Sequence, residues 1–177
     1  ALQLENRPEF LLHFLALNSL GVSVVPLNPD YREAELRYIL EHSAASAVVT
    51  AQTLESLPKP AKPVGAAECA LLYTSGTTGP SKAVQLTHGS VLFQTRGVAA
   101  MLGLQTGGRS ISYLPSAHVG DRCLTHYGAS LCFGNSVTSI TDHRQVGLAL
   151  VEVRPTVFGG VPRVWEKLKA GLEAAGI

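Results

Sequence analysis

The sequence predicts an α/β fold with a mostly parallel sheet and helices on both faces of that sheet. Short apolar runs typical of buried strands alternate with stretches whose apolar residues recur at helical spacing, and the connections are short. Of the 177 residues, 46% are hydrophobic and 15% are charged, which provides apolar material for a sizeable core. The sequence contains no internal repeat. We therefore expect one domain over residues 1–177.

The first fifty residues indicate helices and strands in alternation. A helix is expected over Pro8–Leu20, because proline is favoured in the first helical turn and Gly21 follows the last helical position. The apolar run Val22–Val25 predicts a buried strand that the following proline ends. A second helix over Tyr31–Glu41 and a short strand over Ala47–Thr50 complete this part of the chain.

A proline-rich linker near residues 51–67 is predicted to separate these elements from the next strands. This stretch contains three prolines and a glycine, and it shows no apolar period. A strand is expected over Cys69–Tyr73, directly before a run of small hydroxyl residues. Another strand is expected over Ala83–Leu86, directly after that run.

The second half of the chain continues the alternation of helix and strand. Thr87 or Ser90 is expected to provide an N-cap, because hydroxyl oxygens accept hydrogen bonds from the free N–H groups of a helix start. The elements expected from there on are a helix to about Leu102, a strand over Ser110–Leu114, a helix within Val119–Phe133, a strand over Ser136–Ile140, a helix capped by Asp142 that ends before Arg154, a strand over Thr156–Phe158 and a helix that starts at Pro162.

Charge, cysteine content and hydropathy exclude several classes of protein. The formal net charge is +1 without any run of Lys or Arg, so the basic stripe of a nucleic-acid-binding protein is missing. Cys69, Cys123 and Cys132 are odd in number and lack zinc-ligand spacing, which favours reduced thiols in the cytoplasm. The most apolar segment, Phe10–Val25, is too short and too polar for a transmembrane segment. We expect a cytoplasmic protein, with peripheral membrane association left open.

The stretch YTSGTTGPSK, Tyr73 to Lys82, combines glycines, small hydroxyl residues and a final lysine. Glycines after a buried strand let consecutive backbone N–H groups converge on an anion. Serine and threonine hydroxyls add donors that rotate toward several oxygens, and the lysine adds one mobile positive charge. The stretch therefore predicts a polyphosphate site. The alternative is a surface loop without a ligand.

The Walker A loop, G-x-x-x-x-G-K-[ST], does not account for this stretch. Ser81 stands where that pattern requires glycine, and Ala83 stands where it requires the Ser or Thr that binds magnesium. The residues after Lys82 also have the pattern of a strand, whereas a Walker loop opens a helix.

The stretch resembles the signature of the adenylate-forming enzymes, which is close to Y-T-S-G-T-T-G-x-P-K-G-V followed by T-H. LLYTSGTTGPSKAVQLTH matches it nearly end to end, with departures at Ser81 and Ala83, where the signature has Pro and Gly. Alanine at position 83 is expected to obstruct a backbone geometry that glycine permits. In this family the loop wraps the β- and γ-phosphates of ATP. The resemblance thus implies a catalytic Lys82 and an ATP-binding loop made of Thr74, Ser75, Gly76, Thr77, Thr78, Gly79 and Lys82.

Two later segments resemble the long-chain fatty acyl-CoA synthetases within this family. SYLPSAHVGDR is similar to Y-L-P-L-A-H-x-x-E-R, and RPTVFGGVPRVWEKL is similar to K-P-T-x-F-x-x-V-P-R-V-W-E-K-I. The resemblance implies that His118 is catalytic and lies near the acyl and adenylate site, and that Gly159 and Gly160 line the acyl pocket. A packed His118 that closes a strand-to-helix turn is an equally open interpretation. Arg163 and Trp165 are interpreted as structural residues.

The resemblance implies a fatty acid–CoA ligase whose substrates are a fatty acid, ATP and coenzyme A, with Mg²⁺ as cofactor. The fatty acid carboxylate would attack the α-phosphate of ATP to give an acyl-adenylate and pyrophosphate, and the thiol of coenzyme A would then displace AMP. Positioning and charge neutralisation would supply most of the catalysis.

Later motifs of the family, including its magnesium-binding glutamate and ribose-binding aspartate, have no match in this sequence. We therefore expect a partial AMP-binding N-terminal domain over residues 1–177, with the C-terminal domain absent. Such a chain is expected to be inactive alone, as a truncated form or as a split form completed by a separate chain. The alternative from another class is a non-catalytic remnant that binds a nucleotide or a partner.

Overall fold

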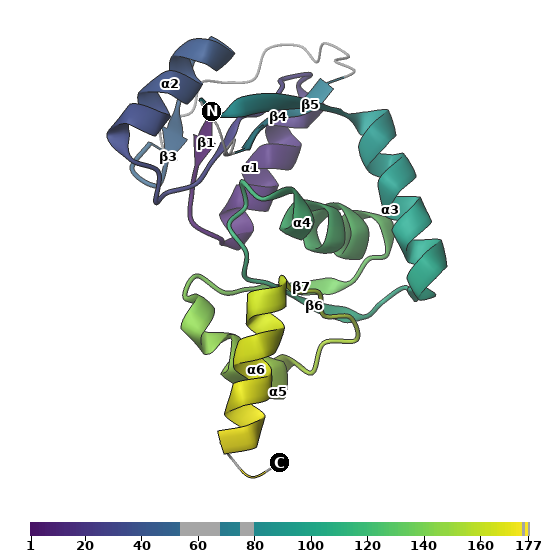
Figure 1. Cartoon of the computed structure of the whole chain (residues 1–177). Helices are drawn as coiled ribbons and strands as arrows, with labels where there is room; N and C mark the ends of the chain where they lie inside the picture. The colour runs from purple at the N-terminus through teal and green to yellow at the C-terminus, as the bar shows by residue number, and fades with distance from the viewer. Residues whose placement is uncertain (54–67, 75–79, 175, 177) are drawn as a thin grey trace.

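The computed structural model describes residues 1–53, 68–74, 80–174 and 176 (Figure 1). The predicted linker over 51–67 lies outside the described residues except for its first three positions, and so do Ser75–Gly79 of the predicted phosphate loop. In chain order the elements are β1 (Leu2–Gln3), α1 (Pro8–Ser19), β2 (Pro26–Leu27), α2 (Glu33–Ser43), β3 (Val49–Thr50), β4 (Glu68–Thr74), β5 (Lys82–Thr87), α3 (His88–Leu102), β6 (Arg109–Ser112), α4 (Val119–Asp121), the π-helix η2 (Arg122–Cys132), β7 (Ser136–Ser139), the 3₁₀-helix η3 (His143–Gln145), α5 (Val146–Val153) and α6 (Pro162–Ala174).

Most strand pairs among the described residues are parallel, as predicted. β1 lies between β2 and β3 and runs parallel to both. A parallel bridge between Val24 and Ala70 connects this small sheet to β4. β6 and β7 form a second parallel pair, whereas β4 and β5 form an antiparallel hairpin. The α/β class of the fold is therefore confirmed.

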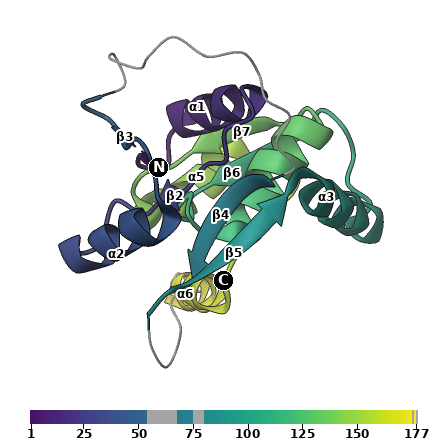
Figure 2. The same ribbon diagram turned by 90° about the horizontal axis from the view of Figure 1, so that it is seen from above.

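Helices cover both faces of the first sheet because neighbouring residues of a strand point to opposite sides. Val24 and Leu72 pack in a cluster with Phe10 and Phe14 of α1. The next residue along each of these extended segments, Val25 before β2 and Tyr73 in β4, packs instead in a cluster with Ile39 of α2. Figure 2 shows α1 and α2 on either side of the strands. Side chains that alternate along these segments thus form two separate apolar layers, one under α1 and one under α2.

A third apolar cluster lies around β6 and holds α5 and α6 (Figure 1). Tyr113, which follows β6, stacks on Phe158 with ring centroids 5.5 Å apart. Phe158 in turn meets the Trp165 ring of α6 edge to face at 5.4 Å. No residue described in α6 is fully buried. This helix is therefore attached mainly through the aromatic stack and the partly buried Val164.

The strand predicted over Val22–Val25 is displaced by a few residues. β2 consists of Pro26–Leu27, and Val24 contributes only the bridge to Ala70. Proline interrupts a strand where the pairing needs a backbone N–H, which proline lacks. β1 instead pairs with this segment through the carbonyl of Val25, because Leu2 N donates to Val25 O at 2.9 Å. The prediction that proline stops this strand was wrong for that reason.

The strand predicted over Thr156–Phe158 is not a strand in the structure. Thr156 N donates to Arg109 O at 2.9 Å, but Arg109 N donates to the Thr156 hydroxyl at 3.0 Å instead of to a backbone carbonyl. A side-chain oxygen thus replaces the second ladder bond, and the segment follows the edge of β6 without forming a regular strand.

The other predicted helices and strands are present, with boundaries shifted by a few residues. Thr87 is the N-cap of α3, and its hydroxyl accepts a hydrogen bond from Ser90 N at 3.1 Å. Asp142 caps η3, which continues into α5, and that helix ends before Arg154 as predicted. The helix predicted within Val119–Phe133 is a short α-helix followed by the π-helix η2.

The wide winding of η2 depends on Gly128. A Cβ atom at this position would lie 2.6 Å from the carbonyl oxygen of Cys123, five residues earlier. That oxygen belongs to the backbone and cannot move aside cheaply. Glycine therefore permits the winding that directs Arg122, Thr125, His126 and Tyr127 into the interior.

Arg122 is the largest fully buried side chain among the described residues. Its Cζ atom lies 3.7 Å from the centre of the Phe14 ring, and the Tyr127 and Phe10 rings are 5.0 and 5.4 Å away. Arg122 Nη2 donates to the Tyr127 hydroxyl, and Nη1 donates to Ser116 O at 3.4 Å. Aromatic faces and neutral oxygens therefore take the place of water around a permanent charge.

A second buried polar group lies beside Arg122 and joins Asn6, Ser112, Asp121 and His126. The Ser112 hydroxyl is 2.6 Å from Asp121 Oδ2, 2.8 Å from Asn6 Oδ1 and 3.3 Å from His126 Nε2. Burial raises the pKa of Asp121 to about 6, although the bond from Ser112 opposes the rise. Burial and the charge of Arg122 lower the pKa of His126 to about 3, so His126 is neutral at pH 7.

We predict that Gly128→Ala lowers the free energy of unfolding by about 1–3 kcal/mol, because the added methyl group collides with the Cys123 carbonyl. Urea denaturation of the 177-residue chain measures this loss. The matched control is Gly97→Ala in α3, where an added Cβ has no neighbour within 4 Å. That control is expected to gain about 0.5–1 kcal/mol from better helix propensity. An unchanged urea midpoint for Gly128→Ala would contradict the assignment.

The lowered pKa of His126 predicts a specific pH dependence of stability. Between pH 6.5 and 3 the unfolded chain binds a proton at His126 that the folded chain excludes, so acidification favours unfolding. This contribution falls by about 2 kcal/mol from pH 7 to pH 5. Asp121 acts in the opposite direction, because its raised pKa makes the folded chain bind the extra proton between pH 6 and 4.

Comparison of the wild type with His126→Gln isolates the histidine contribution. From pH 7 to pH 5 the wild type should lose about 2 kcal/mol relative to the variant, measured by urea denaturation at both pH values. His143→Gln, which removes an exposed imidazole, controls for the general effect of losing a histidine. Equal pH dependence of the wild type and His126→Gln would show that the buried imidazole takes up a proton in the folded state.

Candidate functional site

The β4–β5 hairpin places the two ends of the predicted phosphate loop side by side. Thr74 and Lys82 are opposite each other in the antiparallel register. The Thr74 hydroxyl also donates to the Lys82 carbonyl at 3.4 Å. Two of the seven residues predicted to bind ATP are thus held at the end of the hairpin where the loop sequence begins and ends. The other five, Ser75–Gly79, lie outside the described residues.

Helix α2 supports both strands of this hairpin. Tyr38 Oη donates to the Ser81 carbonyl at 3.1 Å, and His42 Nδ1 lies 2.8 Å from Tyr73 Oη. Burial raises the pKa of the Tyr73 phenol, which keeps it a neutral donor. The residues before and after the loop are therefore fixed to the same helix. The roles of Tyr38 and His42 were not predicted from the sequence; the signal for them is their spacing of four residues on one helix face.

Ala83 does not obstruct the hairpin, contrary to expectation. It lies in the regular strand β5 opposite Tyr73, and its backbone is not among those with positive φ. Its methyl group packs against the apolar cluster that contains Val25 and Ile39. Ser81, the other departure from the signature, contributes its backbone carbonyl to Tyr38, a contact that does not depend on the side chain.

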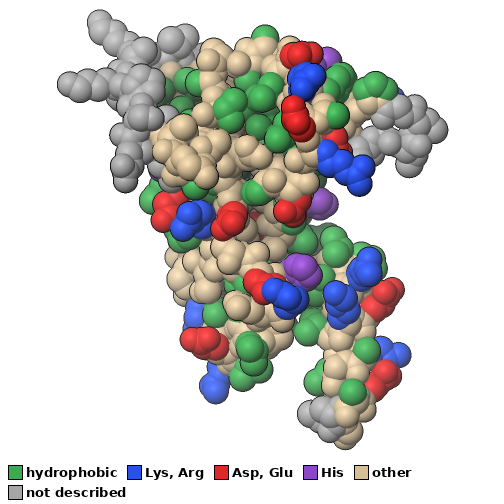
Figure 3. All heavy atoms as spheres, turned by 90° about the vertical axis from the view of Figure 1, so that its left-hand side faces the viewer, with side chains coloured by type: hydrophobic (Ala, Val, Ile, Leu, Met, Phe, Trp, Pro, Cys, Tyr) green, Lys and Arg blue, Asp and Glu red, His purple; other side chains and the backbone are tan. Residues whose placement is uncertain are grey.

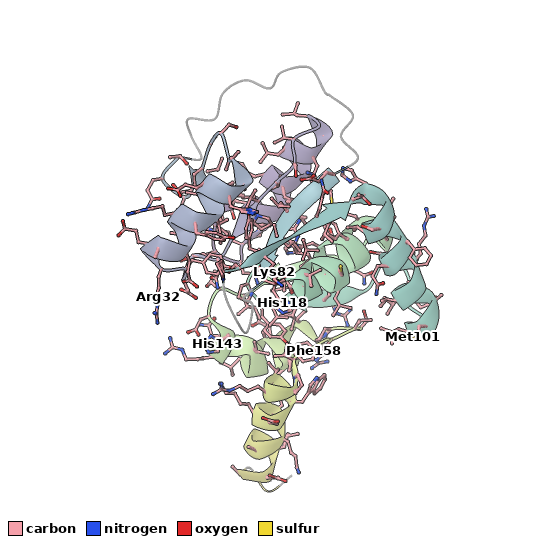
Figure 4. All side chains as sticks on the ribbon, turned by 45° about the horizontal axis from the view of Figure 1, so that its top comes forward. Arg32, Lys82, Met101, His118, His143 and Phe158 are labelled. Carbon is pink, nitrogen blue, oxygen red and sulfur yellow. The ribbon has the colours of Figure 1, made fainter. Side chains whose placement is uncertain are left out.

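Lys82 is exposed at the start of β5 (Figure 4). Among the described residues, no carboxylate forms an ion pair with it. A lysine that is exposed and not neutralised keeps its charge available for an anionic ligand. This position fits the predicted contact with a phosphate.

His118 lies beyond the C-terminal end of β6, where it is the N-cap of α4. Its Nδ1 accepts a hydrogen bond from Gly120 N at 3.0 Å, and its own N–H donates to Pro115 O at 2.7 Å. The side chain is exposed, so His118 is not a packed core residue. It does close the strand-to-helix turn, and its free face remains available to a ligand. Whether it is catalytic stays a prediction.

Gly159 and Gly160 are wedged between Tyr113, η2 and α6. Tyr113 Oη donates to Gly159 O at 3.0 Å, and Trp165 Nε1 donates to Gly160 O at 3.2 Å. A Cβ at Gly160 would lie 2.9 Å from Tyr113 Oη, and one at Gly159 would lie 2.7 Å from Leu124 Cδ1. At Gly160, glycine lets the backbone approach the aromatic stack, whereas at Gly159 the close atom is the end of the flexible Leu124 side chain, which can turn aside. Trp165 anchors α6, as its structural interpretation predicted.

A cleft of about 1530 Å³ opens between α5 and α6. Its walls include Tyr113, Leu150, Val151, Trp165 and Leu172, and Figure 3 shows the hollow with basic side chains near its rim. Burial and the nearby Asp121 raise the pKa of Tyr113, so its phenol stays a neutral hydrogen-bond donor. The cleft reaches Pro115 and Ser116 of the segment that leads to His118.

The structure brings the predicted residues together in two groups rather than in one. Thr74 and Lys82 belong to the hairpin, whereas Tyr113 connects Gly159 to the segment that bears His118. No hydrogen bond between described residues joins the two groups. Within the described ranges, no three His, Cys, Asp or Glu side chains are grouped so as to hold a metal ion. In the same part of the chain, no helix has the length and apolarity needed to cross a membrane.

Curated relatives share this sequence over part of their length. The protein named "Putative fatty-acid–CoA ligase fadD11" from Mycobacterium tuberculosis is 52% identical over 103 residues, which cover 58% of this chain and 18% of that protein. Long chain acyl-CoA synthetase 5 of Arabidopsis thaliana is 38% identical over 116 residues, which cover 59% of this chain and 16% of that protein. The chain therefore spans about a fifth of the length of the curated relatives it matches.

Solved structures share the fold. O-succinylbenzoate coenzyme A synthetase from Bacillus subtilis, in complex with AMP, superposes with a TM-score of 0.82 at 24% identity over 94% of this chain and 50% of that chain. The profile described as AMP-binding enzyme matches residues 1–68 and 54–176. The hairpin at the signature sequence, the shared fold and this family match all point to the same family. The chain belongs to the family of AMP-binding enzymes.

Proposed function

We propose that this chain is the N-terminal part of a fatty acid–CoA ligase and contributes the phosphate loop and His118 to ATP-dependent formation of an acyl-adenylate. The observation that carries the proposal is the hairpin that holds Thr74 opposite Lys82 at the ends of the loop sequence. Similarity to the fadD11 protein supports the fatty acyl substrate. Location in the cytoplasm is part of the proposal, supported by the three free cysteines.

Lys82 and Thr74 are proposed to orient the triphosphate of ATP. The exposed ammonium group of Lys82 would contact the β- and γ-phosphates, whose charge grows as pyrophosphate leaves. The hydroxyl of Thr74 can rotate from the Lys82 carbonyl to a phosphate oxygen. Because α2 fixes both strands through Tyr38 and His42, the two groups are held in place before the nucleotide binds.

His118 and the cleft are proposed to hold the acyl half of the reaction. The cleft beside Tyr113 has a volume large enough for an acyl chain, and its lining includes Pro115 and Ser116 of the segment that leads to His118. In this position His118 would meet the carboxylate that attacks the α-phosphate. The carboxylate oxygen would bond to the α-phosphorus as the bond from that phosphorus to the pyrophosphate oxygen breaks. The thiol of coenzyme A would later displace AMP from the acyl carbon.

Mg²⁺ and coenzyme A remain proposals that the described residues do not place. The donor set for Mg²⁺ is carboxylate oxygen, and no acidic cluster of that kind occurs within the described ranges. The corresponding B. subtilis synthetase was solved in complex with ATP and magnesium ion. None of the comparisons supports completion by a separate partner chain.

We predict that a chimera in which this chain replaces the matching segment of the fadD11 protein catalyses fatty-acid-dependent exchange between ATP and pyrophosphate. Lys82→Ala in the chimera should lower the exchange rate at least about tenfold, because hydrogen bonds to charged groups contribute about 1.5–3 kcal/mol. Radiolabelled pyrophosphate measures the exchange. The control is Arg96→Ala, which removes an exposed positive charge from α3 and should leave the rate unchanged.

A folded chimera without exchange would favour the alternative, a non-catalytic remnant that binds nucleotide or a partner. Exchange that survives Lys82→Ala would instead exclude the proposed role of this lysine. The two outcomes separate loss of the whole function from loss of one contact.

We also predict that the 177-residue chain alone makes no acyl-CoA from fatty acid, ATP, Mg²⁺ and coenzyme A. The reason is that the chain spans 18% of the fadD11 protein, so the proposed ligase site needs residues from the rest of such an enzyme. Mass spectrometry of the reaction detects the thioester, with the chimera as the positive control. Acyl-CoA formed by the purified chain would contradict the prediction.

A further inference from the structure

We infer that Ser112 and Asp121, together with Asn6, are positioning residues for His118. They hold the segment from Tyr113 to Ser116, which connects the end of β6 to the turn that bears His118. The inference rests on the proposed function, because the position of His118 matters only if this end of β6 binds the acyl or adenylate group. None of the three residues touches the proposed ligands, so they act through the backbone of the segment.

The first contact holds the beginning of the segment. Ser112, Asp121 and Asn6 are 0%, 2% and 8% exposed, so no water competes freely for their hydrogen bonds. The single hydroxyl proton of Ser112 is donated most strongly to the Asp121 carboxylate, 2.6 Å away, because the bond is charge-assisted. The backbone N–H of Tyr113 also lies near enough to this carboxyl to lower its pKa. Asp121 thus holds Ser112, the last residue of β6.

The second contact holds the end of the segment. Ser116 Oγ donates to Asn6 Oδ1 at 3.4 Å, and Arg122 Nη1 donates to the Ser116 carbonyl at 3.4 Å. Asn6 Oδ1 is also 2.8 Å from the Ser112 hydroxyl. Because Ser112 has one hydroxyl proton, its contact with Asn6 Oδ1 shares that proton with the Asp121 bond, and Asn6 is linked to the end of the segment through Ser116. Pro115, between Ser112 and Ser116, is exposed and receives no side-chain support of this kind.

His118 follows the segment directly and has little freedom of its own. Its N–H donates to Pro115 O at 2.7 Å, and its Nδ1 accepts from Gly120 N at 3.0 Å. A Cβ at Gly120 would lie only 3.0 Å from Nδ1, which shows how closely the ring folds against the backbone. Any displacement of the segment therefore moves the imidazole.

Stability alone does not account for this arrangement. The ionised carboxylate of Asp121 is disfavoured by burial, and an apolar side chain of similar size would fill the space without that cost. The three polar side chains instead select one conformation of the segment. That is the property needed of residues that hold a ligand-binding side chain in place.

Comparison of Ser112→Ala with Ser110→Ala tests the inference in the 177-residue chain. Both serines are buried in β6 and point to the same face, but among the described residues the Ser110 hydroxyl donates its hydrogen bond to the Ser136 carbonyl, at 3.5 Å, and not to the group around Asp121. Amide hydrogen exchange, read by NMR, reports on Tyr113, His118 and Gly120. We expect Ser112→Ala to speed exchange there about tenfold, which corresponds to the loss of one buried hydrogen bond. Ser110→Ala should leave those three rates unchanged.

The amides of Val24 and Leu71 serve as the internal reference, because they lie in the other sheet and pair across the bridge to β4. Faster exchange at the His118 segment with an unchanged reference supports the inference. An equal rise at both places, or no rise, overturns it, because the hydroxyl then serves only the stability of the core. The imidazole ¹⁵N resonances of His118 give a second readout, and they should shift in Ser112→Ala alone.

Asp121→Asn provides a second variant if Ser112→Ala does not fold. Asparagine keeps the shape of the side chain and one acceptor oxygen but removes the charge that strengthens the bond from Ser112. Exchange at Tyr113 should rise relative to Leu71, and equal rates would overturn the inference. None of these measurements depends on activity. An inactive chimera with a correctly held segment would therefore count against the proposed function and not against the positioning role.

Discussion

The burial of Arg122 is the constraint on which the rest of the structure depends. Its guanidinium group carries a permanent charge and its side chain has no solvent exposure, so the interior must supply every compensating contact. Phe14 from α1, Tyr127 from η2 itself and the Ser116 carbonyl after β6 provide such contacts, while Arg122 Nε has no hydrogen-bond partner among the described residues. One side chain of η2 thus holds α1, which is far from it in the sequence, against the segment between β6 and His118.

The candidate site combines two groups that different layers of the fold hold in place. On one side, α2 supports the hairpin through Tyr38 and His42, so the ends of the phosphate loop move with that helix. On the other side, the buried group of Asn6, Ser112 and Asp121 supports the segment that leads to His118. The fit of a ligand that contacts both groups would therefore depend on how the first sheet packs against η2.

The cleft beside α6 has a different physical basis. No residue described in α6 is fully buried, and α5 leaves Leu148 and Val151 75% and 73% exposed. The position of α6 relies on the stack of Tyr113, Phe158 and Trp165 and on Gly160, which allows the backbone to approach it. The wall of the cleft formed by α6 is thus held by few contacts, whereas the wall near Tyr113 belongs to the core.

The sequence by itself determined the α/β class, most helices and strands, and the strands on either side of the hydroxyl-rich stretch, because these follow from local periodicity, caps and a specific motif. The antiparallel pairing of those two strands was decided by the tertiary structure. The tertiary structure alone decided that β2 includes Pro26, because that depends on which strand pairs with which carbonyl. It also decided that the chain around Thr156 pairs through a side chain, that η2 winds as a π-helix, and that Arg122 and Asp121 are buried. A charged residue in a sequence normally indicates solvent, and only the meeting of α1, η2 and the segment after β6 creates a polar interior for it.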